Sequence, residues 1–151
     1  MEITSPKQQA LPDFVLLKQR FEEMEKGHQA EIKRVASISG VADLPTYYRW
    51  LKGYGADMRM QRIAFMLPHV KHKVDTPTLG QQLYKAGISE MRLFQIVRSE
   101  SPRDLEQLRR LVIQAEPKLD WGEFGKTLYF WGKQAKQRLL EQYFTPIKTQ
   151  Q

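Results

Sequence analysis

Residues 101–115 read SPRDLEQLRRLVIQA, and their apolar side chains recur at the spacing of a single helical face. The apolar stripe consists of Leu105, Leu108, Leu111, Val112 and Ala115. Such spacing is typical of an amphipathic helix whose stripe faces a core. Ser101-Pro102-Arg103-Asp104 has the form of a capping box with proline at the first helical position. We therefore expect a helix that opens at this segment and buries its leucines.

The segments on either side of this stretch repeat the helical pattern. Before it, Thr78 and Ser89 are placed to cap two shorter helices, and Gly87 between them suits a left-handed helix end. After it, Asp120-Trp121-Gly122-Glu123 is a second capping box, which predicts one long final helix. The buried seam of that helix is expected to be Trp121, Phe124, Leu128, Trp131, Ala135 and Leu139.

The N-terminal half predicts four further helices. Their expected spans are about 14–27, 28–38, 45–53 and 60–67. The aromatic residues in them, such as Tyr47 and Trp50, fall at helical spacing and are expected in the core rather than as stacking platforms. Alternation with a period of two, the mark of a half-buried strand, is nearly absent.

These patterns predict an all-α fold of about 7–9 helices in two small packed helical-bundle subdomains. The N-terminal subdomain would span residues 13–67 and the C-terminal one residues 78–145. Prolines bound a linker loop at 68–77 between them. Residues 1–12 are expected to be a flexible N-terminus and residues 146–151 a frayed tail.

Charge is unevenly distributed along the chain. The 151 residues include 24 Lys and Arg against 17 Asp and Glu, which gives a formal net charge of +7. The runs 58–74 and 124–140 contain no acidic residue, whereas acids gather at 22–31. A one-sided concentration of cations favours a polyanion as partner, and nucleic acid is the first candidate.

Cationic side chains on the C-terminal helices point away from the predicted apolar stripes. Eight of them are placed to form a cationic track: Arg92, Arg98, Arg103, Arg109, Arg110, Lys126, Lys133 and Lys136. A track along successive helices suits the phosphates of an extended strand. Solvated surface charge is the competing interpretation for each residue, and Arg109 could equally pair with Glu106.

The sequence gives little support to catalysis or metal binding. It contains no cysteine, no glycine-rich phosphate loop and no nucleophile elbow. His69 and His72 have a spacing that can bind metal, but Asp75 is the only acid near them. We therefore expect no enzyme activity, no metal and no cofactor. The lack of cysteine and of a long apolar run predicts a cytoplasmic protein without a membrane partner.

One motif supports an alternative function. Residues 79–98 have the layout of a helix-turn-helix, with Arg92, Gln95 and Arg98 as outward groups that could read base edges. A helical hairpin with glycine and serine at its turn is common in any helical bundle. Sequence-specific binding of duplex DNA is therefore the second interpretation.

Several short segments are distinctive: LRRL at 108–111, AEP at 115–117, LDW at 119–121, WGK at 131–133 and IKRV at 32–35. Together they resemble the CasB family, the small subunit of the type I-E CRISPR Cascade complex. The similarity runs from about Phe14 to Phe144 and is most specific in the C-terminal half.

The resemblance implies properties that the spacing alone does not. Members of this family are all-helical and have no catalytic activity. Two copies lie head to tail in the complex, against its backbone subunits and its large subunit. They help to hold the displaced non-target DNA strand and so stabilise the R-loop; the guide RNA is a further candidate partner. The family's basic positions correspond here to Arg34, Arg92, Arg98, Arg109, Arg110, Lys133 and Lys136.

Overall fold

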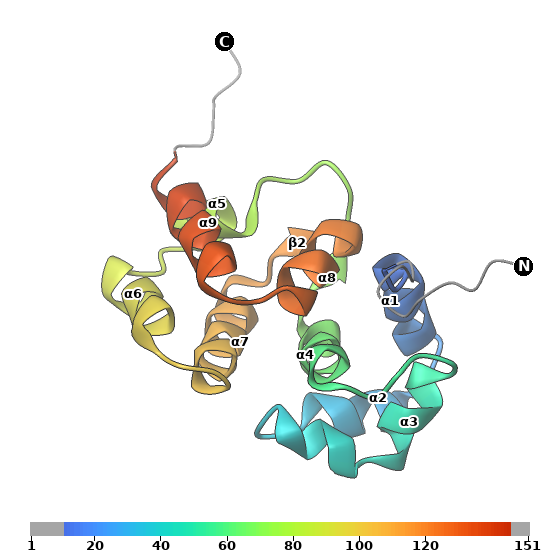
Figure 1. The fold of residues 1–151 in the computed structure, drawn as a ribbon. Helices are drawn as coiled ribbons and strands as arrows, with labels where there is room; N and C mark the ends of the chain where they lie inside the picture. The colour runs from blue at the N-terminus through green and yellow to red at the C-terminus, as the bar shows by residue number, and fades with distance from the viewer. Residues whose placement is uncertain (1–10, 146–151) are drawn as a thin grey trace, which may run out of the picture.

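The computed structural model describes residues 11–145, so the expected frayed tail and all but two residues of the expected flexible N-terminus lie outside the described residues. Nine α-helices account for most of that range (Figure 1). They are α1 (Phe14–Glu22), α2 (Lys26–Lys33), α3 (Pro45–Leu51), α4 (Met58–Met66), α5 (Leu79–Lys85), α6 (Glu90–Arg98), α7 (Arg103–Ala115), α8 (Trp121–Tyr129) and α9 (Lys133–Phe144). The predicted all-α class is therefore confirmed, with two short 3-10 helices, η2 (Ser39–Asp43) and η3 (Leu67–His69), between the helices.

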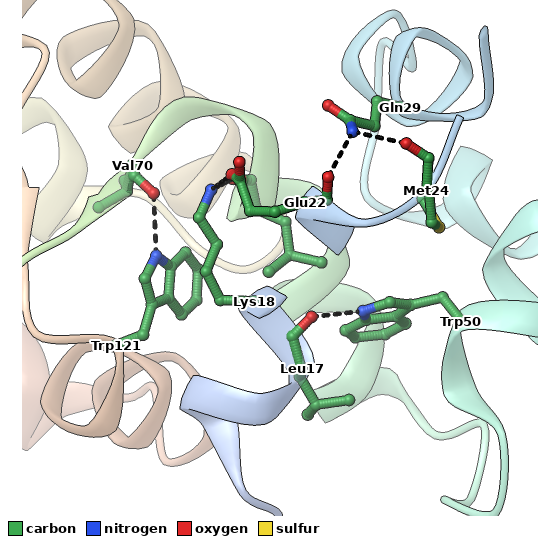
Figure 2. Close-up of polar contacts among 9 residues, drawn as sticks. Leu17, Lys18, Glu22, Met24, Gln29, Trp50, Val70 and Trp121 are labelled. Carbon is green, nitrogen blue, oxygen red and sulfur yellow. Dashed lines mark hydrogen bonds and ion pairs between the residues drawn. The ribbon is translucent and has the colours of Figure 1, made fainter. Parts of the chain in front are cut away.

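The helices pack around one continuous core. α5 packs along α9, α6 lies against both α7 and α9, and α8 contacts α1 and α4 (Figure 1). Gly80 on α5 permits the first contact, because an added Cβ would lie 2.7 Å from the Leu139 carbonyl oxygen on α9. The expected burial of aromatic residues is confirmed for Tyr47, Trp50, Trp121 and Trp131 and is wrong for Tyr48, which is 50% exposed. Trp50 and Trp121 donate their indole N–H to the carbonyls of Leu17 and Val70 (Figure 2).

Several helix starts follow the predicted capping chemistry. Thr78 and Gln81 form a reciprocal capping box at α5, and the Ser89 hydroxyl accepts from the Arg92 backbone N–H at 3.2 Å. Gly87 between these helices has φ +85°, the left-handed conformation expected of it. Asp120 caps α8 by accepting from the Gly122 backbone N–H, but the predicted capping box is incomplete, because the Glu123 side chain does not bond back to the Asp120 backbone.

The predicted capping box at Ser101-Pro102-Arg103-Asp104 is wrong. Pro102 precedes α7 and no side chain caps that end. Asp104 is buried and its carboxylate accepts instead from the Trp131 indole and from Lys136. The residue that resembles the acidic partner of a cap is thus used in a tertiary contact.

The first two helices are shorter than predicted. α1 ends at Glu22, and Gly27 lies inside α2 rather than at the end of α1. The Gln29 side chain accounts for the turn, because its amide donates to the carbonyls of Glu22 and Met24 (Figure 2). α2 ends at Lys33 instead of continuing to Ile38.

The predicted long final helix is two helices. The chain breaks at residues 130–132, where Gly132 is extended with φ 172°. The Arg62 guanidinium stabilises the break by donating to the carbonyls of Leu128 and Tyr129, each at 3.2 Å. The six residues of the predicted seam are nevertheless all buried, as expected.

The segment predicted as a linker loop contains structure. Its residues 71–72 form strand β1 (Lys71–His72), which pairs in parallel with β2 (Lys118–Leu119). The Lys73 backbone N–H also donates to the Leu119 carbonyl at 2.9 Å. These short strands were not foreseen, because two residues are too few to show an alternating pattern. The division into two subdomains stays a prediction.

Candidate nucleic-acid interface

The nine candidate cations come from five parts of the fold. Arg92 and Arg98 belong to α6, Lys126 to α8, and Arg34 follows the last residue of α2. α7 carries Arg103, Arg109 and Arg110, and α9 carries Lys133 and Lys136.

Two polar contacts tie three of these helices together. The Arg92 guanidinium donates to the Gln114 side chain at 2.6 Å, which joins α6 to α7. Lys136 Nζ donates to the Ser99 carbonyl at 2.7 Å, which joins α9 to the turn between α6 and α7. That turn is flanked by Arg98 at the end of α6 and Arg103 at the start of α7. Cations from α6, α7 and the start of α9 thus lie on adjacent elements.

Arg109 turns inward and holds two segments together. Its guanidinium donates to the Val35 carbonyl at 2.6 Å and lies 4.1 Å from the centre of the Phe65 ring. Burial lowers the pKa of this guanidinium below its ordinary value. No ion pair joins it to Glu106 within residues 11–145, because that carboxylate accepts from the Ile38 backbone N–H instead. Arg109 therefore stabilises the fold and is poorly placed to contact a phosphate.

Lys136 is similarly engaged. Its Nζ lies 2.8 Å from the Asp104 carboxylate, and only 14% of the lysine side chain and 2% of the aspartate side chain are exposed. The charge of Lys136 is thus neutralised inside the protein. A helical wheel places this lysine opposite the apolar seam, but the turn before α7 covers it.

Six of the candidate cations are exposed. They are Arg34, Arg98, Arg103, Arg110, Lys126 and Lys133. Within residues 11–145, no hydrogen bond or ion pair joins any of these six side chains to another residue. Arg98 is the nearest to an internal partner, with its guanidinium 5.5 Å from the centre of the Phe94 ring. These six exposed cations are open to an anion from outside.

The two histidines considered for metal binding lie in different surroundings. His72 Nδ1 accepts from the Trp121 backbone N–H at 3.0 Å, at the start of α8. Burial, followed by the charges of Arg109 and Lys33, lowers the pKa of His69 to about 4. The described part of the chain contains no cluster of three or more His, Cys, Asp or Glu side chains suited to a metal ion. None of its helices is both long and apolar enough to cross a membrane.

A second cationic surface was not predicted. A hollow of about 750 Å³ lies between α1, α2 and β1, lined by Lys18, Lys26, Lys33 and Lys71 among others. Lys18 is buried there, donating to the Leu67 carbonyl and pairing with Glu22 at 2.7 Å (Figure 2). Lys18, Lys26 and Lys33 are interspersed with glutamates along the sequence. They therefore lie in no acid-free run that would have indicated a cationic surface.

The comparisons with known proteins agree on one family. Residues 28–144 match the family described as CRISPR-associated protein Cse2. The chain is 33% identical over 147 residues to the CRISPR system Cascade subunit CasB of Escherichia coli strain K12, covering 87% of this chain and 92% of that one. The fold matches a chain in the crystal structure of E. coli Cascade bound to a PAM-containing dsDNA target, with a TM-score of 0.82 and 32% identity. That match covers 89% of this chain and 95% of the other. The family match, the sequence identity and the structural similarity together show that the chain belongs to the Cse2 family of CRISPR-associated proteins.

Proposed function

We propose that this chain is a non-catalytic subunit of a type I-E Cascade complex and that its exposed cations hold the displaced, non-target DNA strand. The assignment to Cascade is supported by the E. coli relative, a Cascade subunit, and by the structural neighbour, a Cascade bound to target DNA. The role in strand binding is supported by one observation above all. The six exposed cations lie on or beside helices of one basic protein, and within residues 11–145 their side chains make no hydrogen bond or ion pair.

The physical role of such a surface is to bias an almost balanced equilibrium. In RNA-guided effectors, the guide–target heteroduplex is about as stable as the DNA duplex that it replaces. Contacts to the nucleic-acid backbone can therefore shift the equilibrium towards the open state. A displaced strand held by phosphate contacts re-anneals less readily. Because phosphate contacts carry no direct base information, the binding is tolerant of sequence.

In the complex, the proposed partners are the backbone subunits, the large subunit and a second copy of this chain placed head to tail. The guide RNA is a further proposed contact. No residue is assigned a catalytic role, and no cofactor is required.

The test uses a reconstituted complex that contains this chain. Arg103→Gln with Arg110→Gln removes two exposed cations of α7, and we expect a shorter R-loop lifetime with normal assembly. For the chain with a single-stranded oligonucleotide, six phosphate contacts predict a slope of log affinity against log salt of about −4, and the double variant should reduce it to about −3. Lys52→Gln is the matched control, since Lys52 is an exposed cation at the end of α3.

Two results would contradict the proposal. An unchanged R-loop lifetime in a normally assembled double variant would mean that these arginines are only solvated. A preference of about 10³ or more for one duplex sequence over random duplex would instead support the helix-turn-helix interpretation of residues 79–98.

A further inference from the structure

An aromatic side chain is exposed at the break between α8 and α9. Phe130 follows the last residue of α8 and is 56% exposed. An exposed apolar residue is ordinary on a protein surface and indicates nothing by itself. The surroundings of Phe130 are what distinguish it.

The backbone around Phe130 is held on both sides. The Arg62 guanidinium binds the carbonyls of Leu128 and Tyr129, and the Phe130 backbone N–H donates to the Lys126 carbonyl at 3.0 Å. The next residue, Trp131, is buried, and its indole N–H donates to Asp104 at 2.9 Å. Because these contacts fix the backbone and Trp131 points inward, the Phe130 side chain is left outward. The backbone that carries its ring is therefore pre-positioned, and a ligand would not have to order it.

Positive charge flanks the exposed ring. Lys126 precedes Phe130 by four residues, the spacing that places two side chains on one helical face. On the other side the Phe130 ring meets the Tyr129 ring edge to face, with centroids 5.1 Å apart and planes at 87°. The Arg59 guanidinium lies 4.3 Å from the centre of the Tyr129 ring and pairs with Asp57. Lys133 begins the next helix.

We propose that Phe130 is a stacking platform for an unpaired base, with Lys126 and Lys133 binding the phosphates beside that base. The proposal rests on the proposed function and adds a base contact to it. Proteins that bind single strands combine cations along the backbone with aromatic rings under the bases, and each such ring contributes without reading sequence. A duplex base pair is already stacked on both faces, so this contact selects a single strand over a duplex.

The experiment uses the full chain and two single-stranded oligonucleotides of equal length, one with normal bases and one with abasic linkers. Phe130→Ala should weaken binding of the normal oligonucleotide about 5- to 150-fold. It should leave both the abasic affinity and the salt slope unchanged. Phe130→Tyr, which keeps an aromatic face, should restore the lost affinity. A 2-aminopurine base in the oligonucleotide should be quenched by the unchanged chain and not by Phe130→Ala.

Phe144→Ala is the matched control, because Phe144 is a 50% exposed aromatic at the far end of α9. An equal loss in the control, an equal loss for the abasic strand, or no loss at all would overturn the platform. In each of those cases a salt slope near −4 in the unchanged chain leaves the proposed function standing. If the unchanged chain shows no salt-dependent binding, the proposed function and the platform both fail. Urea unfolding of each variant separates a folding defect from a binding defect.

Discussion

Replacing Asp104 by alanine should destabilise the protein more than any substitution of an exposed charge. Asp104 is 1% exposed, and its carboxylate has three partners, of which one belongs to the next residue and two are distant in the sequence. It accepts from the Trp131 indole at 2.9 Å and from the Leu105 backbone N–H at 2.7 Å, and it pairs with Lys136 at 2.8 Å. Alanine removes the acceptor for all three groups at once.

The magnitude follows from what remains buried. Without the carboxylate, the Lys136 ammonium keeps only the Ser99 carbonyl, and the Trp131 indole N–H loses its partner. Removing one member of a buried ion pair costs about 3–5 kcal/mol, because the other charge is left uncompensated. For a chain of this length that corresponds to a fall in Tm of about 6–20 °C. Asp104→Asn keeps an acceptor for the indole and should lose less.

Urea unfolding measures the loss, with far-UV circular dichroism as the probe because Trp131 fluorescence reports only its own surroundings. Lys136→Met alone should also destabilise, and combined with Asp104→Asn it should cost less than the two single changes added together. A loss below about 1 kcal/mol for Asp104→Ala would place the pair among ordinary surface contacts and refute the reasoning. Lys136→Met also separates stability from binding, because it should lower the free energy of unfolding and leave the salt slope of oligonucleotide binding unchanged.

Three further outcomes follow from other parts of the structure. Burial lowers the pKa of His69 to about 4 from the ordinary 6.5, so between these pH values the unfolded chain binds a proton that the folded chain does not. The free energy of unfolding should therefore be highest above pH 6.5 and fall towards pH 4. His69→Gln should remove this dependence from urea midpoints measured at several pH values. Gly80→Ala should destabilise the protein by about 1–3 kcal/mol because the added Cβ would meet the α9 backbone. Gly27 lies inside α2 with open space around it, so Gly27→Ala should stabilise the protein by about 1 kcal/mol. Thermal melts in which both variants shift Tm in the same direction would contradict this contrast. Arg109→Met should lower the urea midpoint and leave oligonucleotide affinity unchanged, and the reverse pattern would return Arg109 to the binding surface.

The helical fold was predictable because its evidence is local. Apolar spacing identifies a helix wherever one face is buried, and Thr78, Ser89 and Asp120 cap helices through atoms only two or three residues away. The two-residue strands could not be predicted, since their pairing joins Lys71 to Lys118 across the sequence and has no local pattern. The backbone conformation at Phe130 could not be predicted either, because it depends on a helix break that a distant arginine stabilises.

One kind of contact accounts for the misplaced ends of α2 and α8 and for the inward-turned cations Arg109 and Lys136. Each helix ends with carbonyls that no residue of its own helix can satisfy. After α2 the carbonyl of Val35 is bound by Arg109, at the break after α8 two carbonyls are bound by Arg62, and at the turn before α7 the Ser99 carbonyl is bound by Lys136.

A cation captured in this way alters two predictions together: it lets a helix end earlier than its apolar pattern suggests, and it removes one charge from the surface. A helical wheel shows the direction of a side chain from its own axis but not the carbonyls of another segment within its reach. The cations left for a partner are therefore those that no nearby helix end requires. Arg103 and Arg110 are therefore favoured as phosphate contacts over Arg109, although all three share α7. Single alanine variants would separate arginines that bind phosphate from those that stabilise the fold. The first kind should change the salt slope of oligonucleotide binding, and the second kind should lower the urea midpoint.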